Sequence, residues 1–446
     1  MHDTGRSASS QVAAPKGMVM LQPPSSLSAV PSTAPPGYVR RLAAAQFGIY
    51  MAIIAPVTGG LSVKIQHLVG ADATPARLGL VTGAGAAVAM VCQPLAGRLS
   101  DRCTSAAGMR RPFIVSGLLV AAVGLIACGW APNVTVLLIA WCIAQAGANF
   151  AMAGTGATIA DQVPDAKRGS VSGIVGSVTS LGITVGAVLL FVLPTDLLRF
   201  AVPAILGLLL GLWFALRLRD RIRQHPAAQP LNLRQLMLSF VFNPRKHPDF
   251  AWAWLSKFFI ALGFGALPGY LTLFLAADFG VTDTDEQLQF NAIANVIGLV
   301  ALVLFSVLGG YLSDRIGRRK PFIIGAGLVM AGALAGIALT PALGAAGMPA
   351  ILVLQVVLSL GAGMFFAVDQ ALCLHLLPDK DDTAKDLGVL NIANTLPQSL
   401  SPFLAGVLFI PVGNALFDAG YPLLFLASAV FCAIASLAIT RIKNSA

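Results

Sequence analysis

The chain has 446 residues, of which 57% are hydrophobic and 11% are charged, and its mean hydropathy is +0.80. Soluble domains carry about 25% charged residues, so this composition excludes an ordinary soluble protein and indicates a membrane protein. The formal net charge of +10 requires no nucleic-acid partner, because basic residues beside membrane spans act as topology signals.

Twelve apolar stretches each approach the roughly 20 residues that cross a bilayer as a helix. This pattern predicts an all-α membrane protein with twelve transmembrane helices. In chain order the stretches extend over 38–60, 77–97, 113–131, 135–159, 170–193, 199–217, 250–277, 288–311, 321–340, 349–377, 388–411 and 420–440.

The predicted helices form two halves of six, 38–217 and 250–440, joined by a basic cytoplasmic linker at 218–249. Residues 1–37 are rich in Ser, Pro and Ala and lack the basic segment and apolar core of a signal peptide. We expect them to be a disordered cytoplasmic tail. Residues 441–446 form a second, short cytoplasmic tail.

The basic residues predict the orientation of the chain in the membrane. With the amino terminus in the cytoplasm, 25 of the 29 Lys and Arg residues fall on the cytoplasmic side and three, Lys64, Arg77 and Arg199, fall outside. This asymmetry predicts that both termini are cytoplasmic. We expect a multi-pass protein of the plasma membrane.

One charged loop occurs twice. The sequence GRLSDR at Gly97–Arg102 returns as GYLSDR at Gly310–Arg315, about half the chain later, and each copy precedes a basic cluster that ends in Pro-Phe. A repeat of this period in a polytopic protein indicates that one bundle of helices was duplicated. Duplicated bundles of this kind are typical of transporters.

Each copy places a poorly hydrated aspartate at the cytoplasmic end of a span, where it needs a hydrogen-bonding or charged partner. We expect Asp101 to meet the start of the eleventh helix near 385–388, and Asp314 the start of the fifth near 169–170, only while the cytoplasmic side is closed. The alternative is that these residues are positive-inside anchors. The predicted latch comprises Asp101, Arg102, Arg110, Arg111, Asp161, Arg168, Asp314, Arg315, Arg318 and Arg319.

Two ionisable residues lie well within spans, Lys257 in the seventh and Asp369 in the tenth. At a rise of about 1.5 Å per residue, both are roughly 12 to 14 Å from the cytoplasmic ends of their helices. Intramembrane charges are usually paired, so we expect an ion pair between them. Asp369 would accept and release a proton, and Lys257 would set the pKa of Asp369 as the pair forms and breaks. The alternatives are a permanent structural salt bridge and a Lys257 side chain that extends to the inner surface.

Uncharged polar residues recur at helical spacing in several spans, and amides can both donate to and accept from sugar hydroxyls. Hydrogen bonds between helices are the alternative role. The candidate substrate-binding residues are Gln46, Tyr50, Gln145, Asn149, Asn291, Asn295, Asn391, Asn394 and Gln398. Pro56, Pro268 and Pro397 are candidate hinges within spans.

The doubled loop resembles the signature of the major facilitator superfamily, over roughly residues 38–440. The resemblance implies two six-helix domains, a central cavity, alternating access and a latch role for the motif aspartate. SDRCTSAAGMRRPFI at 100–114 and DLGVLNIANTLPQSLSP at 386–402 are similar to the sucrose and glycoside transporters, which implies a sugar or glycoside substrate. The chain lacks the acidic residue and the arginine that this branch has in its fourth and fifth helices.

These observations predict a monomeric secondary transporter that moves a sugar or glycoside with a proton or another cation. We expect no cofactor, no metal and no enzymatic activity, because the sequence has no metal-ligand spacing, nucleophile elbow or carboxylate pair. The alternatives are an exporter of drugs or lipophilic compounds, a transporter-like membrane sensor and a polytopic membrane enzyme.

Overall fold

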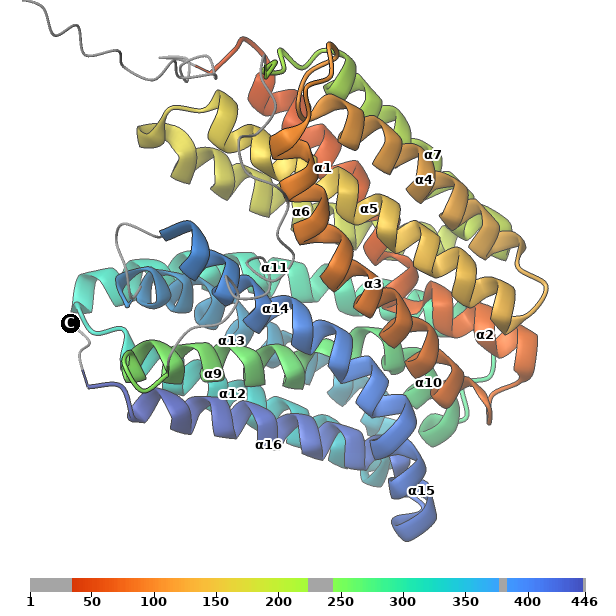
Figure 1. Ribbon diagram of the computed structural model, residues 1–446. Coiled ribbons are helices and arrows are strands. Elements are labelled where there is room, and N and C mark those ends of the chain that lie inside the picture. The colour runs from red at the N-terminus through yellow and green to blue at the C-terminus, as the bar shows by residue number, and fades with distance from the viewer. Residues whose placement is uncertain (1–33, 224–243, 377–382, 444–446) are drawn as a thin grey trace, which may run out of the picture.

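The computed structural model describes residues 34–223, 244–376 and 383–443, and its regular elements in these ranges are all helices (Figure 1). Most of the predicted amino-terminal tail and most of the predicted linker lie outside the described residues. The first half consists of α1 (Tyr38–Ile54), η1 (Pro56–Gly60), α2 (Leu61–Val69), α3 (Thr74–Arg102), α4 (Arg111–Trp130), α5 (Val134–Gln162), α6 (Asp165–Val192) and α7 (Asp196–Leu216).

The second half repeats this arrangement of helices. It consists of α9 (Pro248–Gly265), α10 (Leu267–Phe279), α11 (Thr284–Ile316), α12 (Lys320–Leu339), η2 (Thr340–Ala346), α13 (Gly347–His375), α14 (Thr383–Leu404), η3 (Ala405–Phe409), α15 (Ile410–Phe417) and α16 (Gly420–Thr440). The prediction of an all-α membrane protein with two six-helix bundles is confirmed.

The described chain has eleven helical stretches that are long and apolar enough to cross a membrane. One of them, Lys320–Asp369, has 50 residues, which as one straight helix would extend about 75 Å, more than twice the roughly 30 Å hydrocarbon core. The chain reverses within it at η2, where Gly344 has a φ of 54°, a conformation that glycine adopts without strain. The stretch therefore provides two spans, α12 and α13, and the total is twelve.

The first span of each half is interrupted at a proline. Pro56 begins the π-helical turn η1 between α1 and α2, and Pro268 is the second residue of α10, directly after the break that follows α9. Proline cannot donate the backbone hydrogen bond that a continuous helix needs. Pro397, the third candidate hinge, lies inside α14, which continues past it.

Glycines allow the helices of one half to pack closely. A Cβ atom on Gly117 of α4 would lie 2.6 Å from the carbonyl oxygen of Gly147 on α5, and one on Gly48 of α1 would lie 2.9 Å from the Cα of Gly207 on α7. Helices in lipid associate mainly through such close packing, because lipid tails are as apolar as the side chains they would replace. The helices of the first half thereby approach one another closely.

The molecule has two ends, a linker end and an opposite end. The linker end contains the end of α3, the start of α4, the end of α7 and the start of α9. The opposite end contains the end of α2 and the starts of α7 and α11. The ribbons of the two halves lie together around α2, α3 and α10 and diverge toward the side of the carboxy terminus, at the linker end (Figure 1).

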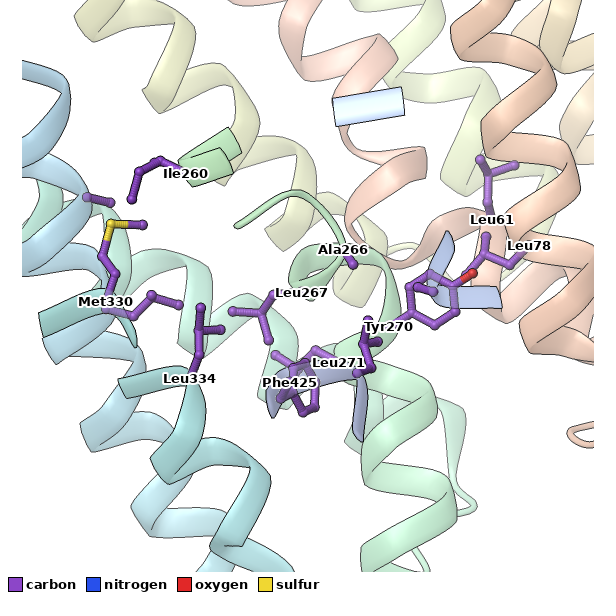
Figure 2. Close-up of a cluster of buried hydrophobic side chains, with 14 of the residues drawn as sticks. Leu61, Leu78, Ile260, Ala266, Leu267, Tyr270, Leu271, Met330, Leu334 and Phe425 are labelled. Carbon is purple, nitrogen blue, oxygen red and sulfur yellow. The ribbon is translucent and has the colours of Figure 1, made fainter. Parts of the chain in front are cut away.

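A buried hydrophobic cluster joins the halves. Figure 2 shows Leu61 and Leu78, from α2 and α3 of the first half, beside Tyr270 of α10, from which the cluster continues to Met330 of α12 and Phe425 of α16. The Tyr270 hydroxyl lies 3.1 Å from the carbonyl oxygen of Pro75 and 2.9 Å from that of Pro402. The phenol thus links α3 to α14 within the contact between the halves.

Candidate functional site

The two intramembrane charges predicted from the sequence form an ion pair. Lys257 of α9 donates a hydrogen bond from Nζ to Oδ2 of Asp369 on α13, and the two side chains are 4% and 0% exposed. An almost fully buried Lys257 excludes the alternative in which this side chain extends to the membrane surface. α9 and α13 therefore bring together residues 112 positions apart in the chain.

The second carboxylate oxygen of Asp369 also has a partner. Cys373, one turn later on α13, is buried and lies with Sγ 3.6 Å from Asp369 Oδ1, in position to donate a weak hydrogen bond. Sequence reasoning missed Cys373, although its spacing of four residues from Asp369 places both on one helix face. The buried carboxylate is thus held by one cation and one neutral donor. An unpaired charge here is costly, so separating the pair favours protonation of the carboxylate.

At the linker end, Arg110 is the centre of an ionic cluster that the first half forms with the start of the linker. It lies 2.6 Å from Asp101 Oδ1 through Nη1, and it donates from Nε to Asp161 Oδ2 at 2.9 Å. Arg221 reaches the other oxygen of Asp161 at 3.2 Å. Burial lowers the pKa of Arg110, but the hydrogen bond and charge of Asp161 and the charge of Asp101 outweigh this and raise it. The cluster joins the ends of α3, α4 and α5 to the start of the linker.

The linker is fixed to the start of α4 by Asp220. Its Oδ2 accepts hydrogen bonds from the backbone N–H groups of Arg110 and Arg111, each at 2.7 Å. Gly108 has a φ of 108°, and a Cβ atom there would lie 2.3 Å from Asp220 Oδ2. Burial raises the pKa of Asp220, although the backbone hydrogen bonds lower it. Sequence reasoning missed Asp220; the signal was an acidic residue within the basic run that follows α7.

The remaining predicted latch residues have separate environments. Arg168 donates to the carbonyl oxygens of Val163 and Ala160, at the end of α5, and Arg111 donates to that of Leu218. Arg315 and Arg318 are exposed, whereas Arg102 and Arg319 are half-buried. The side chains of Asp314 and of 385–388, the expected partner of Asp101, lie outside the described residues.

The candidate substrate amides of the first half have partners on α5. Gln46 of α1 is 6% exposed; its Nε2 lies 3.3 Å from Thr155 Oγ1 of α5, and its Oε1 has no partner in the described part of the chain. On α5, Asn149 donates to both the backbone oxygen (2.8 Å) and Oε1 (3.3 Å) of Gln145. Gln46 therefore has a buried oxygen, Oε1, that could accept a hydrogen bond from a substrate hydroxyl.

In the second half, two candidates on α11 contact each other, and one of them also contacts the first half. Asn295 donates to the backbone oxygen of Asn291 at 2.9 Å, and Asn291 donates to that of Thr58 in the first half. Asn291 thus contributes to the contact between the halves. Of the other candidates, Tyr50 and Asn394 are half-buried, Gln398 is exposed, and the side chain of Asn391 lies outside the described residues. No group of three metal-ligating side chains occurs in the described ranges.

Known proteins share this architecture. Residues 40–304 and 253–444 match the family model described as Major Facilitator Superfamily. A bacterial homologue of the human lysosomal transporter Spinster, inward-facing and unoccupied, is 18% identical, with a TM-score of 0.67 over 92% of this chain and 99% of that one. The nucleoside transporter NupG, in a mutant form, is 14% identical, with a TM-score of 0.69 over 91% and 100%.

Two sugar transporters are also similar. A D-xylose-proton symporter is 17% identical, with a TM-score of 0.67 over 91% of this chain and 97% of that one. A general alpha-glucoside permease of Schizosaccharomyces pombe is 31% identical over 122 residues, 24% of this chain and 22% of the permease. The structural matches show the fold, and the family model spans both halves, so the chain belongs to the major facilitator superfamily and is a multi-pass membrane transporter.

Proposed function

We propose that the chain is a secondary active transporter that moves a sugar or glycoside with a proton, and that Asp369 and Lys257 form its coupling site. The observation that carries this proposal is the ion pair between α9 and α13, buried from solvent on both sides of the contact. The names of the xylose-proton symporter and the alpha-glucoside permease support the substrate class.

The coupling step follows from electrostatics. While Lys257 contacts Asp369, the carboxylate is neutralised and has no need of a proton. When α9 and α13 shift during the transport cycle, Asp369 loses its cation inside a poorly polarisable medium, where an isolated carboxylate is unfavourable. It then takes up a proton, and the returning ammonium group of Lys257 displaces that proton on the other side.

The conformation described here supports alternating access. The hydrogen bonds between the halves named above, from Tyr270 to Pro75 and from Asn291 to Thr58, lie on the opposite-end side of the molecule. With both termini in the cytoplasm of a plasma-membrane protein, this state faces inward. Asp101 is paired with Arg110 in this state, and it meets the start of α14 when the linker end closes.

Purified protein in proteoliposomes tests the coupling site. The assay applies a proton gradient directed into the liposomes and a labelled α-glucoside or pentose. Asp369→Asn should abolish gradient-driven accumulation of the substrate yet retain its exchange across the membrane, because exchange needs no net proton movement. The double variant Lys257→Ala with Asp369→Ala removes both charges and should behave likewise. Full gradient-driven accumulation by the double variant would show that the pair is only structural.

The substrate class needs a separate measurement. A ligand stabilises the state to which it binds, so thermal unfolding in detergent should shift upward with α-glucosides or D-xylose. Nucleosides and cationic drugs serve as comparison ligands in the same assay. A shift with cationic drugs alone would favour the exporter alternative.

A further inference from the structure

The opposite end of the molecule carries a second ionic cluster, with no counterpart among the predicted site residues. Its centre is Asp196, the first residue of α7, and around it lie Lys64 and His67 from α2 and Arg199 from the next turn of α7. The side chains of Lys64 and Arg199 are only 10% and 5% exposed. These are two of the three cations that the sequence places on the less basic side of the membrane, so topology does not explain them.

Asp196 and backbone carbonyl groups hold these cations within the first half. Asp196 lies 3.5 Å from Lys64 Nζ, 3.1 Å from His67 Nδ1 and 3.6 Å from an Arg199 Nη atom. Lys64 also donates to the carbonyl oxygen of Gly129 at 3.1 Å, and Arg199 donates from Nε to that of Leu190 at 3.0 Å. Contacts within the first half therefore position Arg199 independently of its contact with the second half.

Two contacts then cross to the second half. Arg199 Nη2 forms an ion pair with Asp285 Oδ1 at 3.2 Å, and His67 Nε2 lies 3.4 Å from Thr284 Oγ1. Both partners belong to the first turn of α11, which Asp283 fixes by accepting a hydrogen bond from the backbone N–H of Asp285 at 3.0 Å. The ion pair thus joins a rigidly held cation to a rigidly held helix start.

The two sides of this ion pair differ in exposure, which makes the contact reversible. The Asp285 side chain is 72% exposed, so water can solvate its carboxylate when the halves part. Arg199 keeps Asp196 and the Leu190 carbonyl as partners and is not left as an isolated buried charge. An ion pair with one exposed partner contributes modestly, which suits a contact that must break in each cycle.

We propose that Arg199 and Asp285 form an ionic gate that closes the opposite end, with Asp196 as the residue that positions Arg199. The inference rests on the proposed alternating access, since a gate requires a state in which this end opens. Neutral contacts also join α2 to the second half, including the hydrogen bond of 2.8 Å between the hydroxyl groups of Ser62 and Thr272. The gate adds a charge-dependent contribution to this contact between the halves.

Distance measurements between two spin labels test the gate. Ala71→Cys and Leu343→Cys place labels on exposed positions at the opposite end of different halves, in a background in which the partly exposed Cys92, Cys103 and Cys142 are replaced. Asp285→Lys should increase the ratio of long to short distances by about threefold to tenfold, because attraction is replaced by repulsion. Asp285→Asn should have a smaller effect in the same direction.

The matched control is Glu286→Lys, the same charge reversal one residue later on an exposed side chain for which the described structure has no ion pair. It should leave the distances unchanged. Equal distance distributions for Asp285→Lys and Glu286→Lys would overturn the gate. The distance measurement needs no substrate. If Asp285→Lys lengthens the distances but the wild-type protein accumulates no sugar, the gate is retained and only the proposed sugar and proton function is rejected.

Discussion

The two ends of this transporter use ion pairs for different purposes. At the linker end, Asp161 pairs with Arg110, at the start of α4 in the same half, and with Arg221, at the start of the linker. At the opposite end, Arg199 and Asp285 contact each other across the halves. The same chemistry therefore stiffens one half at one end and joins both halves at the other. What an ion pair does in this fold depends on which helices supply its members, more than on its geometry.

The largest expected effect comes from removing Arg110. Arg110→Ala leaves Asp161 with Arg221 alone, and Asp101, whose side chain is 58% exposed, returns to water. We expect a loss of about 2 to 3 kcal/mol in stability, below the cost of stranding a fully buried charge. Thermal unfolding in detergent measures the loss, and Arg217→Ala, an exposed arginine at the end of α7, is the control.

The comparison between the ends also predicts what Arg110→Ala does not change. Because its partners lie in one half, the distance distribution between labels at positions 71 and 343 should stay that of the parent protein. A shift toward long distances as large as that of Asp285→Lys would mean that the linker-end cluster also sets the balance between the two states.

A smaller effect is expected at Asp220, and it depends on pH. Burial raises the pKa of this carboxyl, so the folded state binds its proton more tightly than the unfolded chain, in which the pKa is about 3.9. The contribution of Asp220 is therefore most favourable below about pH 4 and declines as the pH rises through the folded-state pKa. Asp220→Asn stays neutral throughout.

The melting temperature of the wild type minus that of Asp220→Asn should fall between pH 4 and pH 7. Asp220→Ala also removes the acceptor for the first N–H groups of α4, which costs about 1 kcal/mol for a helix cap. A melting-temperature difference that rises with pH would show that the backbone hydrogen bonds outweigh burial at this carboxyl.

The smallest effect on stability is expected for Asp101→Asn and Asp314→Asn. Asp101 is largely exposed here and has one ionic partner in its own half, so its loss should change the free energy of unfolding by less than about 1 kcal/mol. Transport should nevertheless fall, since the proposed latch acts when the linker end is closed. Cysteine labelling at the linker-end mouth should increase in both variants, and unchanged labelling with unchanged flux would remove the latch.

The fold could be predicted from the sequence because its signals are local. Apolar length gave the spans, and the two interruptions that the structure shows at Pro56 and Pro268 follow from the missing N–H of proline. The Lys257–Asp369 contact could be predicted for a similar reason. Two opposite charges at the same depth in an apolar medium are expected to pair, because each is unfavourable alone.

The ends of the helices could not be predicted in the same way. Lys64 and Arg199 were exceptions to a charge count, and nothing within α2 or α7 indicates that Asp285, 86 residues after Arg199, lies beside it. Asn291 is a substrate-binding candidate by residue type alone, and its contact with the backbone of Thr58 in the other half could not be predicted from the sequence. Such contacts depend on how the two helix bundles pack against each other. The hydrophobic pattern of a single helix carries no information about that packing.

The turn between α12 and α13 has a consequence for how the chain enters the membrane. η2 (Thr340–Ala346) contains no charged residue, and the apolar stretch around it runs for 50 residues. We expect the two spans to insert together as a helical hairpin, because a translocating chain meets no charged residue in the turn between them. Arg318 and Arg319, directly before α12, and Lys320, its first residue, form a basic cluster of the kind that sets the orientation of such a hairpin.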